Sequence, residues 1–179
     1  HACALLLCCH VIVNRMAGSA MRELQLACLP AAIGTIGVVY SNITNMRLMS
    51  KVRYAGPAGR DVHPYKPWAD DAVDAEPHFR AFKACQNGVE WTVYAVPVLW
   101  LYVLYTPAIP YVGTLLSWAG AALGLAFGYF NVRYVEGYIV SSEQRLKPFY
   151  QRTRTIRALF YGAGAGIVAS VVQALGFGL

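Results

Sequence analysis

The sequence predicts an all-α fold, an integral membrane four-helix bundle with up-down topology. Hydrophobic residues make up 57% of the 179 residues and charged residues only 13%, whereas a soluble domain carries about 25% charged residues. Three stretches contain no Asp, Glu, Lys, Arg or His, namely residues 24–46, 91–132 and 158–179. The middle stretch is 42 residues long, about twice the ~20 residues that a helix needs to cross a bilayer.

The middle stretch reads as a hairpin of two spans. Pro107 and Pro110 lie near its centre, and two closely spaced prolines end a helix and favour a tight turn. The chain therefore has four predicted spans, at about residues 22–49, 78–105, 111–141 and 150–178.

Residues 1–20 do not fit this scheme. Residues 1–13 are apolar but too short to span a bilayer, and the polar pair Asn14 and Arg15 follows. They resemble the apolar core of a signal peptide that lacks the basic start. We expect a disordered or artefactual extension here, with the four-helix domain over residues 21–179.

The first span carries helix-packing signals. Pro30 is expected to kink it, and Gly34 and Gly37 provide small faces for close helix contact. Asn42 and Asn45 are expected to face other helices. In the fourth span, a similar small face is formed by Gly162, Gly164 and Gly166.

Residues 50–77 are predicted to form a loop because glycine and proline recur there. Its acidic residues, Asp70, Asp71, Asp74 and Glu76, are interpreted as a solvated surface. A metal site is the less favoured alternative, because hard cations need oxygen ligands folded around them. We predict no metal.

Basic residues cluster in two regions. Seven of the 15 Lys and Arg residues lie within residues 47–83 and six within residues 133–157. In a four-span chain these regions share one side, and the positive-inside rule places loops 50–77 and 142–149 in the cytosol. Topology thus accounts for the net charge of +6. No nucleic-acid reader motif accompanies it, so we expect no nucleic-acid binding.

Two ladders of polar residues adjoin the apolar runs. If these stretches are helical, each ladder lies along one face, and charge at the edge of hydrocarbon usually has a partner or a purpose. Together they suit a peptide-sized polar ligand, although an interfacial ion pair and membrane-belt tyrosines are the plainer interpretation. The ladders are Lys83, Asn87, Glu90 and Tyr134, Tyr138, Arg145.

The motifs around these ladders resemble a known family. Residues 79–91 read FRAFKACQNGVEW, residues 133–138 read RYVEGY, and Arg145 follows seven residues after Tyr138. With the junction at Arg47, Leu48 and Lys51, this order is similar to the membrane-associated proteins in eicosanoid and glutathione metabolism (MAPEG). The closest branch is that of microsomal glutathione transferase 2, leukotriene C synthase and the lipoxygenase-activating protein. The resemblance covers about residues 47–160.

This resemblance implies a homotrimer in the endoplasmic reticulum or nuclear envelope, with glutathione as co-substrate. It implies a glutathione transferase or peroxidase acting on a lipophilic electrophile or a lipid hydroperoxide that enters from the membrane lipid. Arg145 would be the catalytic residue that stabilises the thiolate, as a guanidinium stays protonated. The implied glutathione-binding residues are Arg47, Lys83, Asn87, Glu90, Trp91, Tyr134 and Tyr138.

The chain departs from the family pattern at four positions. Trp91 stands where many members have Tyr, Lys83 where Arg is usual, and Cys85 where Gln is common. Lys83 replaces a two-pronged carboxylate contact with a point charge. Leu48 stands where leukotriene C synthase has a second Arg, which argues against a dedicated leukotriene synthase.

Two other functions stay open. A non-enzymatic fatty-acid-binding scaffold, like the lipoxygenase-activating protein, would lack an arginine at position 145, so Arg145 favours the enzyme. A channel or transporter needs polar residues through the membrane centre, and residues 91–132 offer almost none.

Overall fold

The computed structural model describes the backbone of residues 2–55, 72–141 and 143–176, and the side chains of residues 20–52, 79–141 and 143–176. This part of the chain is helical apart from short turns. The helices are α1 (Ala2–Ala55), α2 (Ala72–Tyr105), α3 (Gly113–Val140) and α4 (Leu146–Ala174), with a 3-10 turn, η2 (Thr106–Ala108), between α2 and α3.

Four helical segments, the second of which includes η2, are long and apolar enough to cross a membrane, in agreement with the predicted multi-pass membrane protein. The segments are Ala20–Val52, Phe79–Ala108, Gly113–Val140 and Leu146–Ala174. The fourth helix begins four residues before the predicted start at residue 150, because Pro148 lies in its first turn, where a proline is tolerated.

The predicted loop at residues 50–77 is shorter in the structure. Helix α1 continues to Ala55 and α2 already begins at Ala72. The acidic residues Asp70 and Asp71 lie outside the described part of the chain, as do the side chains of Asp74 and Glu76.

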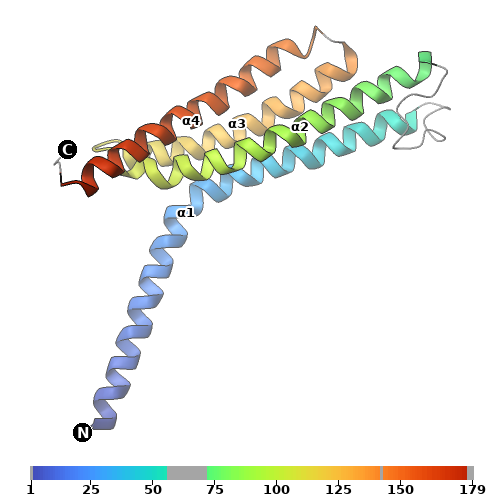
Figure 1. Cartoon of the computed structure of the whole chain (residues 1–179). Coiled ribbons are helices and arrows are strands. Elements are labelled where there is room, and N and C mark those ends of the chain that lie inside the picture. The colour runs from blue at the N-terminus through green and yellow to red at the C-terminus, as the bar shows by residue number, and fades with distance from the viewer. Residues whose placement is uncertain (1, 56–71, 142, 177–179) are drawn as a thin grey trace.

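Helix α1 also includes residues 2–20, for which the sequence favoured a disordered extension. This segment holds no proline and a single glycine, Gly18, so nothing in it ends a helix. Figure 1 shows the first part of α1 projecting away from the other helices and bending where it joins them. Residues 20–27 are exposed, and Pro30, the interior proline of α1, is the first buried residue among the side chains that the structure describes, which start at residue 20. Pro30 therefore accounts for the bend, as predicted.

Successive helices run in opposite directions and lie side by side (Figure 1). Helix α1 packs on α2 and α3, and α4 packs on the other side of the same pair. The largest apolar cluster joins Leu99, Tyr102 and Val103 of α2 to Leu159 and Ala163 of α4. Helices α2 and α3 thus form the centre of the bundle, with α1 and α4 on its flanks.

Glycines set the distance between α1 and α3. A Cβ atom on Gly124 would lie 2.6 Å from the Cα atom of Gly34, and one on Gly128 would meet the carbonyl oxygen of Gly37. The two backbones therefore touch, in agreement with the small face predicted for the first span.

In α4, the prediction of a small packing face is confirmed at two of three glycines. Gly162 lies against the Tyr102 ring and Gly166 against the backbone at Tyr105. Gly164 instead faces open space and is exposed. Because it lies two positions from each neighbour, it falls on the opposite side of the helix.

The turn between α2 and α3 is built from Pro107 and Pro110, as predicted. Tyr111 has a positive φ of 64°, which lets the chain reverse between η2 and α3. Gly113, the first residue of α3, sits so close to the turn that a Cβ atom would lie 2.6 Å from the carbonyl oxygens of Thr106 and Pro107.

Candidate functional site

The candidate site lies at the end of the bundle where α3 connects to α4. Four helix segments meet there: the C-terminal parts of α1 and α3 and the N-terminal parts of α2 and α4 (Figure 1). Ala84, Tyr134 and Val135 form the buried core of this end, and Leu48, Tyr138 and Phe149 pack against them. Aromatic side chains of α3 and α4, among them Tyr134, Tyr138 and Phe149, thus fill the interior of the end at which the residues of both polar ladders lie.

A buried arginine, Arg152 of α4, lies at the centre of the site. Its relative exposure is 0%. Its guanidinium carbon lies 4.2 Å from the ring centroid of Tyr134, 4.9 Å from that of Trp91 and 5.7 Å from that of Phe149. A cation over an aromatic face is attracted by the ring quadrupole, by about 2 kcal/mol or more when desolvated. Three rings therefore replace part of the hydration that this charge loses.

Arg152 is anchored through an amide on α3. Its Nη1 donates to the Oδ1 atom of Asn131 at 2.7 Å, while its Nε and Nη2 have no hydrogen-bond partner within the described chain. A guanidinium only donates, so the oxygen of Asn131 must face Arg152 and its amide nitrogen must face away. That nitrogen donates to Ser41 Oγ at 3.1 Å and to Asn42 Oδ1 at 3.4 Å.

The polar contacts continue across the bundle to α2. Asn42 Nδ2 donates to Thr92 Oγ1 at 2.9 Å. The expectation that Asn42 and Asn45 face other helices is confirmed. Asn45 is fully buried, and its amide lies beside Gly88, where a Cβ atom would be 3.1 Å from Asn45 Nδ2 and 3.3 Å from Asn131 Nδ2. One chain of polar contacts therefore links all four helices.

The phenols connect Arg152 to the outer part of the site. Tyr134 is 4% exposed, and its hydroxyl accepts a hydrogen bond from Asn87 Nδ2 at 3.2 Å. The Tyr134 and Tyr138 ring centroids are 5.7 Å apart. The guanidinium carbon of Arg145 lies 4.4 Å from the Tyr138 ring centroid. The two tyrosines thus stand in contact between two arginines, with Arg152 on the interior side and Arg145 towards the end of the bundle.

The second ladder is not a single helical face. Helix α3 ends at Val140, and Arg145 is the residue that precedes α4. Arg145 contacts the Tyr138 ring because the turn at residues 143–145 brings the start of α4 back over α3. The spacing of residues along a single helix could not produce this contact. Trp91, for its part, packs edge-on against Phe149 with ring centroids 6.0 Å apart.

The structure thus brings together five of the eight predicted site residues and leaves three at the edge. Those grouped around Phe149 and Arg152 are Asn87, Trp91, Tyr134, Tyr138 and Arg145, and with those two residues they are named here the phenol–arginine cluster. Arg47 and Glu90 are exposed on α1 and α2. Lys83 is half-buried, with its Nζ 5.9 Å from the Phe79 ring centroid.

Sequence reasoning missed Arg152 and Asn131. A signal for Arg152 was present, because it continues the buried small and apolar stripe of α4 through Thr155, Leu159 and Ala163 at spacings of three and four. Asn131 lies in the charge-free stretch that was judged almost without polar groups. On the surface of α3, Glu136 forms an exposed ion pair with Arg133 at 2.7 Å.

Chemically, the cluster is a cationic, phenol-lined site at one end of an apolar bundle. The half-buried Arg145 supplies N–H donors and a permanent positive charge, and the phenols supply further hydrogen-bond donors. Such a set stabilises an anion at a membrane boundary. Comparison of the chain with models of known protein families and with curated proteins finds no match.

Proposed function

We propose that this chain is a membrane-bound glutathione transferase with peroxidase capability. The observation that carries the proposal is the position of Arg145 over Tyr138, next to Tyr134 and its Asn87 partner. These residues come from α2, α3 and the turn before α4, and they offer donors and positive charge at one point. Their grouping supports the roles that the family resemblance implies for them.

The proposed chemistry begins with the thiol of glutathione. The pKa of a free thiol is about 8.5, so only a few per cent is thiolate at neutral pH. The Arg145 guanidinium favours the anion electrostatically. In conjugation, the thiolate sulfur forms a bond to an electrophilic carbon, and the leaving group departs with the bonding electron pair. In peroxide reduction, two glutathione molecules become one disulfide while the hydroperoxide yields an alcohol and water.

The remaining groups of glutathione need partners as well. Its two carboxylates suit Arg47 and Lys83, and its ammonium suits Glu90. Arg47 and Glu90 are exposed although they lie within membrane-spanning segments, and charge there usually has a partner. A homotrimer in which each site is shared between neighbouring subunits would cover them, and we propose this assembly.

We also propose the sidedness that the basic residues indicate. The site then opens to the cytosol, where glutathione is available, and the lipophilic substrate arrives through the bilayer. Loops 50–77 and 142–149 lie in the cytosol, and the membrane is that of the endoplasmic reticulum or nuclear envelope.

Titration of the detergent-purified protein with glutathione tests the proposal. Thiolate absorbance near the ultraviolet edge is recorded alongside binding. We expect saturable binding with a thiolate signal, and loss of that signal by at least tenfold in Arg145→Ala. Arg154→Ala, which removes an exposed arginine outside the cluster, is the matched control and retains the signal.

Two results would contradict the proposed glutathione transferase activity. A full thiolate signal in Arg145→Ala would remove that residue from the mechanism. Absence of binding at millimolar glutathione would instead favour the fatty-acid-binding scaffold, because such a protein needs the bundle but not the thiolate.

A further inference from the structure

The outward face of α3 is hollowed on the side of α4. A hollow of about 290 Å³, named here the basic hollow, lies between the two helices and is lined by Tyr129, Phe130, Arg133, Lys147, Pro148 and Gln151. A second hollow of about 350 Å³ adjoins it towards the end of the bundle. The two share Arg133 and Pro148, so they form one continuous depression.

The depression carries a net positive charge. Arg133 and Lys147 are exposed, and Glu136 in the second hollow offsets one of them, which leaves a formal charge of +1. The Arg133–Glu136 pair is itself exposed, and such pairs contribute only about 0–1 kcal/mol. Arg133 therefore stays available to an anion.

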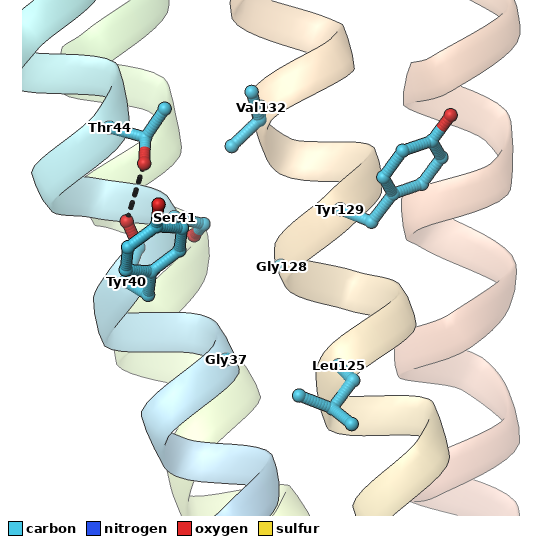
Figure 2. A pocket seen from close by; sticks show the side chains of 8 residues that line it. All are labelled: Gly37, Tyr40, Ser41, Thr44, Leu125, Gly128, Tyr129 and Val132. Carbon is cyan, nitrogen blue, oxygen red and sulfur yellow. Dashed lines mark hydrogen bonds between the residues drawn. The ribbon is translucent and has the colours of Figure 1, made fainter.

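The basic hollow lies on the α4 side of α3, and an apolar groove lies on the α1 side. The groove has a volume of about 340 Å³ and runs between α1 and α3. Gly37 and Gly128, whose backbones touch, are among its lining residues. Figure 2 shows Leu125 and Val132 pointing towards α1 and the Tyr129 ring lying on the α4 side of α3. Tyr129 lines both the groove and the basic hollow.

We propose that this face binds an anionic phospholipid. The phosphate occupies the basic hollow between Arg133 and Lys147, and an acyl chain lies in the apolar groove, with Tyr129 at the boundary. Arg133 directly follows the charge-free stretch of residues 91–132, which places the hollow at headgroup depth. Basic pockets between membrane helices on the cytosolic side bind such headgroups, and tyrosines favour this interfacial zone.

A free phosphate ion offers the same headgroup chemistry but does not explain the groove. An amphiphile with one charged end and one apolar chain matches both parts of the surface. The occupant is therefore a lipid rather than a soluble anion, and the two sources are distinguished by experiment.

Native mass spectrometry of the full chain in detergent tests the headgroup site. The probes are dioleoyl phosphatidic acid, dioleoyl phosphatidylcholine and inorganic phosphate. One lysine near an anionic surface contributes about 1 kcal/mol, so Lys147→Gln is expected to weaken phosphatidic acid binding roughly fivefold. Lys51→Gln, an exposed lysine at the same end of the bundle, is the matched control and leaves binding unchanged.

Equal affinity of the two lysine variants for phosphatidic acid would overturn the proposal. So would displacement of the lipid by inorganic phosphate at equal concentration, because the site would then bind a small anion. Circular dichroism verifies that each variant keeps its helices. No glutathione is present, so the outcome is independent of the proposed enzyme.

A second variant tests the groove. Thr44 lines it, and its hydroxyl donates to the Tyr40 carbonyl of its own helix at 3.0 Å, so this hydroxyl is not needed for a hydrogen bond between helices. Thr44→Trp fills the groove, and we expect it to abolish the preference for dioleoyl over dihexanoyl phosphatidic acid. Leu115→Trp, elsewhere on the exposed face of α3, keeps that preference. Retention of the preference in Thr44→Trp would show that the chain lies elsewhere.

Discussion

At the scale of single residues, the energetics centre on Arg152. Burying a charge in a low-dielectric interior costs several kcal/mol even after relaxation. Here the opposing contributions are three aromatic rings and one hydrogen bond to Asn131. Moving either the rings or the Asn131 amide would therefore leave the buried charge with fewer favourable contacts.

Two substitutions of Arg152 separate what its volume contributes to the free energy of unfolding from what its hydrogen bond contributes. Arg152→Ala opens a cavity among the rings and is expected to lower the free energy of unfolding by about 2–5 kcal/mol. Arg152→Met fills most of that volume but strands the Asn131 oxygen, at a cost of about 1–3 kcal/mol. Detergent-titration unfolding of the purified protein measures both.

Arg154→Met is the control for these variants because Arg154 is exposed two residues further along the same helix. We expect its effect to stay within about 0.5 kcal/mol. A more stable Arg152→Met protein would contradict the account, since desolvation of the charge would then outweigh its contacts.

At the scale of helices, direct backbone packing at glycine residues holds α1 against α3. Lipid chains are as apolar as leucine, so membrane helices associate through close packing rather than through the hydrophobic effect. Gly34 and Gly37 meet Gly124 and Gly128 backbone to backbone. This approach also brings Ser41 and Asn42 within reach of Asn131.

Adding one methyl group tests this interface. Gly128→Ala places a Cβ atom against the Gly37 carbonyl, and overpacking of this kind costs about 1–3 kcal/mol. Gly164→Ala, where nothing lies within 4 Å, is expected to be neutral or to stabilise α4 by up to about 1 kcal/mol. Thermal unfolding in detergent compares the pair. Equal stability of the two variants would mean that α1 and α3 separate at no cost.

At the scale of the whole molecule, the alternating helix directions put the C-terminal ends of α1 and α3 and the N-terminal ends of α2 and α4 at the same end of the bundle (Figure 1). Lys51 lies near the C-terminal end of α1 and Glu143 in the turn before α4, so both exposed residues belong to that end, whereas Tyr111, between η2 and α3, belongs to the other. The phenol–arginine cluster and the basic hollow share the first end. The orientation of the chain in the membrane therefore decides which compartment the proposed glutathione site faces and which leaflet the proposed lipid site faces.

Single cysteines introduced into a cysteine-free background measure that sidedness. In sealed microsomes, a membrane-impermeant maleimide is expected to label Lys51→Cys and Glu143→Cys without detergent, because the proposed topology places these positions in the cytosol. Tyr111→Cys, fully exposed in the turn, should react only after the membrane is opened. The reverse pattern would invert the proposed topology and separate the site from cytosolic glutathione.

The sequence by itself determined the four spans, the turn at Pro107 and Pro110, and the bend at Pro30. These features depend on local properties: the length of apolar runs, the missing N–H of proline and the size of glycine. It also singled out Asn87, Trp91, Tyr134, Tyr138 and Arg145, although their proposed roles depend on a resemblance.

Only the tertiary structure decided which of these residues meet. Arg145 contacts Tyr138 through a turn, and Arg152 becomes a buried cation because α4 places it opposite Asn131 and the Tyr134 ring. The sequence shows three arginines in the first half of α4, and its signal for the inward one, the stripe through Thr155, Leu159 and Ala163, is recognised only once the buried face of the helix is known. That choice follows from the rotation of the helix about its own axis, and contacts with α2 and α3 set this rotation.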